Sequence, residues 1–353
     1  MEKPKIFNIK KQILGILLIL LLVVATVFIF TQKLGAITFR DFMNYIRGLE
    51  APLFLVLAFI CVFLSLFSEA GSLYFILTKL WKRPRSSHTV VYGASDIYFS
   101  AITPSATGGQ PAAAYYMCKT GVPASTATVA LILNLFQYTL SLLVLGGIGF
   151  LIFPNIMATA PFKVNLFLMF AVVFNLFFVF LCLSCMLVPT PVQWMGKKCI
   201  ALLSRLRLIR KREAKEAAFD LYLSEYRATL CVLIKNPSLW WAPLLLNLAQ
   251  RIFMYLVPCM ILLAEGGSPS LLLEAFGKQS LATLGANSVP IPGAMGVSEY
   301  LFVTLLGGMF RDKLSALFLV RFVSHYFNFI FSGLLTLAFH IRLHRKRKGN
   351  RNP

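Results

Sequence analysis

Residues 52–80 read PLFLVLAFICVFLSLFSEAGSLYFILTKL and are almost free of charged side chains. At 1.5 Å per residue, an α-helix of this length crosses the roughly 30 Å hydrocarbon core of a bilayer. Hydrophobic residues make up 58% of the 353-residue chain, and the mean hydropathy is +0.76. A soluble protein of this size cannot bury so much apolar surface. The sequence therefore predicts an all-α integral membrane protein.

Five further apolar stretches are long enough to span a membrane, so six full transmembrane helices are expected. The five cover residues 13–30, 124–152, 162–188, 239–264 and 315–341. The first of them follows a lysine-rich segment and resembles a signal peptide. Its apolar run is longer than a typical h-region and no small-residue cleavage site follows it, so we interpret it as a retained span.

Two other apolar segments, residues 91–117 and 270–310, are interrupted by Gly and Pro near their middle. Most basic residues fall on one side of the membrane if each segment enters and leaves on the same face. Both are therefore predicted to be re-entrant helical hairpins, and they enter from opposite faces. Their turns, PSATGGQ at 104–110 and PIPGAMG at 290–296, favour an inverted repeat, and paired broken segments point to a transporter's binding site.

The basic residues also give the orientation and the domain boundaries. The net charge is +21, and Lys and Arg retained on the cytoplasmic face explain it better than a nucleic-acid partner does. We expect a multi-pass plasma-membrane protein with both termini in the cytoplasm. Its predicted parts are a basic N-terminus (1–12), a first membrane half (13–188), a basic amphipathic linker on anionic lipid (189–238), a second membrane half (239–341) and a basic tail (342–353).

Metal, redox and enzymatic chemistry find little support in the sequence. The seven cysteines give no disulfide framework, and the four histidines have no metal-ligand spacing. The linker is too short for a typical enzyme domain. We therefore expect no catalytic residues, no cofactor and no metal.

The first broken hairpin carries small and polar residues that suit a lipid headgroup. Backbone at membrane depth must be buried in protein or line a wet cavity, and the half-helix after the break offers free N–H groups to an anion such as phosphate. A simple tight turn between packed helices is the alternative. The candidate residues are Thr103, Pro104, Ser105, Thr107, Gly108, Gly109 and Gln110. The second hairpin adds Pro290, Pro292, Gly293, Gly296, Ser298 and Glu299, of which Glu299 serves equally well as an ordinary charge at a helix N-terminus.

Four ionisable residues lie inside the apolar segments, where a charge costs about 2.5–3.5 kcal/mol at a helix centre. They are Glu69, Asp96, Arg251 and Arg321. The arginines suit a phosphate group, and the carboxylates then compensate charge or bind a cationic headgroup. Polar residues at helical spacing accompany them: Ser324, His325 and Asn328; Asn247 and Gln250; and Asn134, Gln137 and Tyr138. The alternative is that these side chains only hold the helices together.

Residues 92–117, YGASDIYFSAITPSATGGQPAAAYYM, and 288–300, SVPIPGAMGVSEY, resemble the lysylphosphatidylglycerol synthase transmembrane-region family. That family includes the membrane half of the multiple peptide resistance factor, which is connected with resistance to cationic antimicrobial peptides. The resemblance implies a flippase-like fold that moves aminoacylated phospholipid, or a related polar lipid, between leaflets. The full-length factor continues into a cytoplasmic aminoacyl-tRNA-dependent transferase domain, and we expect no residues for that chemistry here.

The leading hypothesis is therefore a translocase for lysyl-phosphatidylglycerol or a related polar lipid. Two alternatives stay open. One is a membrane phosphatidylglycerol lysyltransferase that uses lysyl-tRNA, and the other is a noncatalytic partner that anchors a separate synthase subunit through residues 197–215. The expected partners are phosphatidylglycerol-type phospholipids, with no nucleic acid unless the transferase alternative holds. A homo-oligomer is compatible with each of these hypotheses.

Overall fold

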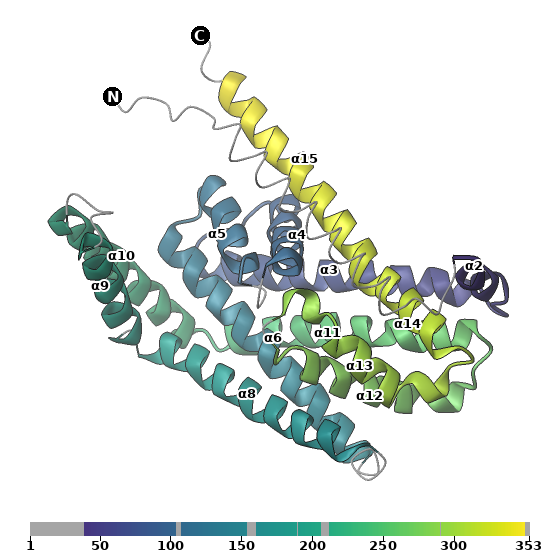
Figure 1. The fold of residues 1–353 in the computed structure, drawn as a ribbon. Coiled ribbons are helices and arrows are strands. Elements are labelled where there is room, and N and C mark those ends of the chain that lie inside the picture. The colour runs from purple at the N-terminus through teal and green to yellow at the C-terminus, as the bar shows by residue number, and fades with distance from the viewer. Residues whose placement is uncertain are drawn as a thin grey trace. The chain divides into compact units, whose positions relative to one another are not determined.

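The computed structural model describes residues 39–103, 107–153, 160–188, 190–205, 212–289 and 291–349, which are helical with short connections and contain no β-strand (Figure 1). Residues 39–49, with helix α2 (Phe39–Arg47), belong to one compact unit, and the chain from Glu50 onward forms a second. The predicted first span at 13–30 and the N-terminus at 1–12 lie outside the described residues, as do Pro104, Ser105 and Pro290.

Five helical runs in the second unit are long and apolar enough to cross a membrane. Their bounds agree closely with the predicted spans, and the chain is a multi-pass membrane protein. They are α3 (Leu53–Leu80), α6 (Ala124–Ile152), α8 (Phe162–Leu187), α11 (Ser238–Ala264) and a final run from Lys313 to Leu343. The final run consists of α14 (Lys313–Arg321), a π-helical turn (Phe322–Phe327) and the first part of α15 (Asn328–Gly349).

Both interrupted segments fold as pairs of short helices. The first pair is α4 (Ser86–Ile102) and α5 (Gly109–Lys119), and the second is α12 (Leu272–Ala286) and α13 (Val297–Leu305). The two helices of each pair pack against each other. The longest of the four, α4, has 17 residues, or about 25 Å at 1.5 Å per residue, which is shorter than the hydrocarbon core. Each break falls where the sequence concentrates Pro and Gly.

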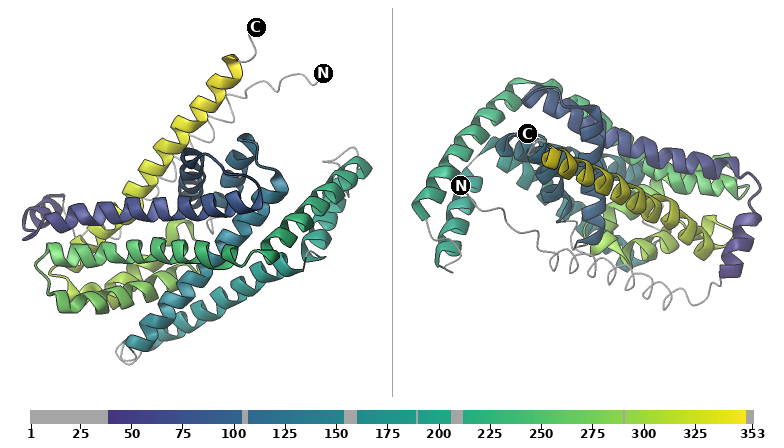
Figure 2. Two further views of the ribbon diagram at one scale, coloured as in Figure 1. Left: turned by 180° about the vertical axis from the view of Figure 1, so that it is seen from behind. Right: turned by 90° about the horizontal axis from the view of Figure 1, so that it is seen from above.

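The two halves of the second unit have the same order of elements, and each half packs one helix of its broken pair against the other half. Each half has a long helix, a broken pair and another long helix: α3, α4/α5 and α6, then α11, α12/α13 and α14/α15. The leading helices α3 and α11 lie side by side (Figures 1 and 2). The first helix of each broken pair packs on the closing helix of the other half, α4 on α15 and α12 on α6. This reciprocal contact is the pattern expected of a two-fold repeat.

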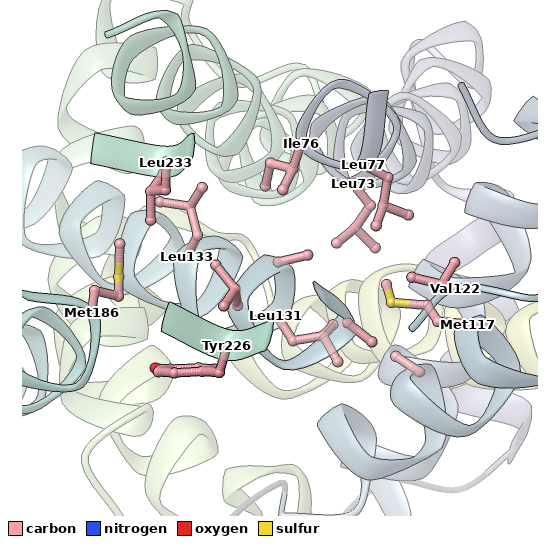
Figure 3. Packing of buried hydrophobic residues seen from close by; sticks show 14 of the residues in the cluster. Leu73, Ile76, Leu77, Met117, Val122, Leu131, Leu133, Met186, Tyr226 and Leu233 are labelled. Atoms are coloured by element: carbon pink, nitrogen blue, oxygen red, sulfur yellow. The ribbon is translucent and has the colours of Figure 1, made fainter. Parts of the chain in front are cut away.

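The linker between α8 and α11 forms two helices, and one of them contributes to the protein core. It contains α9 (Thr190–Arg205) and α10 (Arg212–Lys235), and residues 206–211, in the middle of the basic linker predicted to lie on lipid, are outside the described ranges. Helix α10 places Tyr226 and Leu233 in a core with residues of α3, α5, α6 and α8 (Figure 3). Burial raises the pKa of Tyr226, and its protonated hydroxyl donates to the Cys185 carbonyl oxygen at 2.8 Å. The sequence did not predict this core contact.

Helices α6 and α12 cross at small residues. A Cβ placed on Gly149 would lie 2.7 Å from Ser280 Oγ and 3.1 Å from the Gly277 carbonyl oxygen. Close backbone approach at glycine is a common basis of helix association in membranes, where the hydrophobic effect gives no drive between helices. This crossing joins the first half of the second unit to its second half.

Replacing Gly149 with valine is expected to destabilise the protein by about 1–3 kcal/mol, because the added side chain overpacks the crossing. The thermal unfolding midpoint of the purified protein measures the effect. Gly147 is the matched control on the same helix, since a Cβ there meets nothing within 4 Å. Equal midpoints for Gly149→Val and Gly147→Val would show that the crossing does not hold the halves together.

Candidate functional site: a cavity between the two halves

A cavity of about 710 Å³ lies among the long helices and both broken pairs. This volume is in the range of ligand-binding pockets. The cavity gathers eight of the predicted site residues: Glu69, Asp96, Thr107, Gln110, Arg251, Gly293, Ser298 and Arg321. Five others do not line it: Thr103, Gly108, Gly109, Gly296 and Glu299. The side chain of Pro292 lies outside what the structure describes.

Asp96 joins the two helices of the first broken pair. Its Oδ2 accepts a hydrogen bond from Gln110 Nε2 at 2.8 Å, and its Oδ1 accepts one from Ser100 Oγ at 3.1 Å. Asp96 and Ser100 are on α4, whereas Gln110 is on α5, so the bond to Gln110 closes the hairpin. Gln110 Oε1 is buried and has no hydrogen-bond partner among the described residues. A carboxylate and an unpaired amide oxygen therefore meet at the cavity wall.

Thr103 and the two glycines build the turn rather than the cavity surface. Thr103 Oγ1 donates to the Phe99 carbonyl oxygen at 2.7 Å and accepts from the Gly108 backbone N–H at 2.8 Å. A Cβ on Gly108 would lie 2.5 Å from Thr103 Cγ2. One on Gly109 would overlap Asp96 Oδ1. Thr103 and the glycines thus allow α5 to pack closely against α4. The sequence suggested either a headgroup contact or a simple turn, and the contacts of these three residues are those of a turn.

Glu69 is the second carboxylate in the cavity. It is buried on α3, and its Oε2 accepts a hydrogen bond from Gln250 Nε2 of α11 at 2.9 Å. Within the described ranges neither Glu69 nor Asp96 has an ion-pair partner. A buried carboxylate without a direct ion-pair partner is costly, and Arg251 acts on Glu69 only through electrostatic attraction without a direct ion pair. The two carboxylates therefore favour a positively charged group in the cavity.

The guanidinium of Arg251 is held by a tyrosine, and one of its N–H donors has no acceptor among the described residues. Its guanidinium stacks 4.4 Å from the Tyr138 ring centroid, and its Nη1 donates to the Tyr138 hydroxyl at 3.3 Å. That hydroxyl donates to Asn287 Oδ1 at 3.3 Å, and Asn287 Nδ2 donates to Asn175 Oδ1 at 3.2 Å. Arg251 Nε is buried and, among the residues described, has no acceptor. The guanidinium is thus oriented while part of its hydrogen-bonding capacity remains available to an anion.

Arg321 differs from Arg251 because it forms an ion pair. Its Nη2 lies 2.7 Å from Glu299 Oε1 in an ion pair. Glu299 Oε2 accepts from the Gly296 backbone N–H and from Ser298 Oγ, so it also caps α13. Gly296 has φ of 87°, a left-handed conformation that favours glycine. The sequence treated the arginines as equivalent, but Glu299 already compensates Arg321, which leaves Arg251 as the better anion-binding group.

The ion pair is expected to couple α13 to α14 energetically. In a double-mutant cycle of Glu299→Gln and Arg321→Gln, the two substitutions should be non-additive by about 1–2 kcal/mol, because breaking a shielded pair leaves one charge unpaired. Chemical or thermal unfolding of the four proteins gives this energy. Additive effects would mean that the pair is only a surface contact.

Several residues that line the cavity were not predicted from the sequence. Asn175 is buried on α8, where it donates to Ser288 Oγ at 3.0 Å as well as accepting from Asn287. Gln279 and Thr283 line the cavity with Asn287, and all three lie on α12 or at its end with a spacing of four residues. That spacing, and an asparagine in the middle of a long apolar helix, are signals from which they could have been found. The predicted group of Arg321, Ser324, His325 and Asn328 does line the cavity, across the π-helical turn.

Comparison with known families gives the wider context of this cavity. Residues 12–332 match a family model described as the lysylphosphatidylglycerol synthase TM region. The chain belongs to this family. All cavity residues lie within the matched range. Membership implies a role connected with membrane lipids. No curated protein matches the chain.

Proposed function

We propose that this chain is a polar-lipid translocase of the plasma membrane, which moves lysyl-phosphatidylglycerol or a related phosphatidylglycerol-type lipid between leaflets. The observation that carries the proposal is Arg251, a cavity arginine with a buried Nε that has no acceptor among the described residues. Such a group suits a phosphodiester, which accepts charge-assisted hydrogen bonds from a guanidinium.

The chemistry of the cavity walls favours an amphiphile over a small polar solute. The lining includes the charged residues Glu69, Asp96 and Arg251 and also the apolar residues Leu135, Phe174 and Phe178. A polar solute would leave the aromatic part in contact with water, and a hydrocarbon would leave the charged groups without partners. A phospholipid offers a polar and an apolar portion together.

The headgroup chemistry follows from the same positions. Arg251 binds the phosphate, and Glu69 with Asp96 balances a cationic headgroup such as lysyl-glycerol. Gln110 and Thr107 of the first hairpin offer further hydrogen bonds at the wall. In this proposal Arg321 serves mainly to hold the second hairpin through Glu299.

The proposed topology has six spans and two re-entrant hairpins, with both termini and the linker in the cytoplasm. The short lengths of α4 and α12 support hairpins that do not cross the bilayer. The reciprocal packing of α4 on α15 and of α12 on α6 supports an inverted repeat. In this arrangement the two turns approach the cavity from opposite faces, which gives a lipid headgroup a polar route past mid-depth.

Reconstitution of the purified chain into vesicles tests the proposal. The vesicles contain a trace of lysyl-phosphatidylglycerol, and a membrane-impermeant amine reagent modifies the headgroups of the outer leaflet. We expect inner-leaflet lipid to become reactive with the protein present, with or without an imposed proton gradient. Labelling equal to that of protein-free vesicles under both conditions would contradict the proposal. Synthesis of lysyl-phosphatidylglycerol from lysyl-tRNA and phosphatidylglycerol would instead support the transferase alternative.

A further inference from the structure

We infer that an acyl chain of the translocated lipid lies along an aromatic row on α8, formed by Phe170, Phe174 and Phe178. The inference rests on the proposed function, because it takes the cavity ligand to be a lipid. It adds where the apolar part of that lipid binds and through which wall it reaches the bilayer.

The row is continuous along one face of the helix. The ring centroids of Phe174 and Phe178 are 6.5 Å apart with an interplanar angle of 17°, and those of Phe170 and Phe174 are 6.0 Å apart with an angle of 34°. Residues four apart are neighbours on a helix surface, which places the three rings in line. Such a row offers an elongated apolar surface whose shape fits a hydrocarbon chain.

The row also runs from the cavity to the outside of the helix bundle. Phe174 and Phe178 line the cavity and are partly buried, whereas Phe170 is 54% exposed and does not line it. Helix α8 has apolar side chains on its outward face as well, and Phe177 and Phe180 are each 63% exposed. In a membrane these outward residues contact lipid. The row therefore connects an enclosed apolar wall with the bilayer.

A chain of hydrogen bonds connects the aromatic row to the proposed headgroup site. Asn175, next to Phe174 in the chain, is buried and hydrogen-bonded to Asn287. Asn287 accepts from the same Tyr138 hydroxyl that receives Arg251 Nη1. The aromatic row and the proposed phosphate-binding arginine thus belong to one connected structure. A lipid with its phosphate at Arg251 has the row available to its chains.

The experiment uses the full chain in phosphatidylcholine nanodiscs with a small fraction of phosphatidylglycerol that carries a diazirine in mid-chain. After irradiation, mass spectrometry locates the adducts. We expect adducts on Phe174 and Phe178 that unlabelled phosphatidylglycerol displaces. In Arg251→Gln we expect these adducts to fall by about tenfold, as loss of one charge-assisted contact would produce. Phe177 and Phe180 are the matched controls, and their adducts should change little in either case.

The outcomes separate this inference from the proposed function. Adducts on Phe174 and Phe178 that behave like those on Phe177 and Phe180 would overturn the acyl-chain site. A second phosphatidylglycerol probe, with its diazirine in the headgroup, reports on the cavity itself. If the headgroup probe labels residues around Arg251 while the chain probe misses the row, the inference fails and the translocase proposal survives. If neither probe labels the cavity, both fail.

Discussion

Replacing Arg251 with glutamine is expected to slow lipid headgroup movement strongly while the protein still inserts and folds. The substitution removes the charge that we assign to the lipid phosphate, and a hydrogen bond to a charged group contributes about 1.5–3 kcal/mol. Lipid translocation should slow by about ten- to a hundredfold, measured in the reconstituted vesicles.

Two further variants show whether the loss is specific. Tyr138→Phe keeps the ring on which Arg251 stacks but removes the hydroxyl that accepts from it, so we expect a partial loss. Arg227→Gln is the matched control, because Arg227 is an exposed arginine of α10 that donates to Gln193 away from the cavity. An Arg251→Gln protein that translocates lipid as fast as Arg227→Gln would remove Arg251 from the site.

Gly109→Ala is expected to have the largest effect on stability. A Cβ on Gly109 would overlap Asp96 Oδ1 and Ser100 Oγ and would lie 2.6 Å from the Asp96 carbonyl oxygen. Rotation of side chains cannot relieve the last contact, because it is with backbone. Overpacking of this kind costs about 1–3 kcal/mol or more. It should also break the Asp96–Gln110 hydrogen bond that closes the first hairpin, so translocation should be lost as well.

The control for this prediction is the same substitution at a glycine with space around it. A Cβ on Gly147, in the helical interior of α6, meets nothing within 4 Å. Gly147→Ala should raise stability by about 0.5–1 kcal/mol, since alanine is the better helix former. Thermal unfolding in detergent compares the two proteins. If Gly109→Ala unfolds at the same temperature as the wild type, the close contact of α4 and α5 is not as the structure has it.

The positions of the long helices could be predicted because length and apolar composition decide them. The stretches at 52–80 and 124–152 correspond to α3 and α6 almost residue for residue. The breaks in the two hairpins could be placed for a similar reason, since Pro and Gly occur together there and favour an interruption of the helix. Backbone preferences of this kind act locally and need no knowledge of the partners.

The pairing of side chains could not be predicted, because it depends on which helices meet. Glu299 and Arg321 lie on different helices, and nothing in the sequence distinguishes Arg321 from Arg251, which has no ion-pair partner among the described residues. Thr103 looked like a headgroup ligand, yet its hydroxyl is used by the backbone of its own turn. The burial of Tyr226 on α10 was missed because charged residues around it dominate the composition of the linker. In each case tertiary contacts decided the role.

The proposed translocation route depends most on two hairpins that enter the membrane from opposite faces and return. Single cysteines at Arg85 and Thr120 flank the first hairpin, and those at Ser268 and Asp312 flank the second, in a chain whose native cysteines are replaced. A membrane-impermeant maleimide should label 85 and 120 only from the cytoplasmic side, and 268 and 312 only from the other. Labelling of 85 and 120 from opposite sides, or of 268 and 312 from opposite sides, would contradict the account.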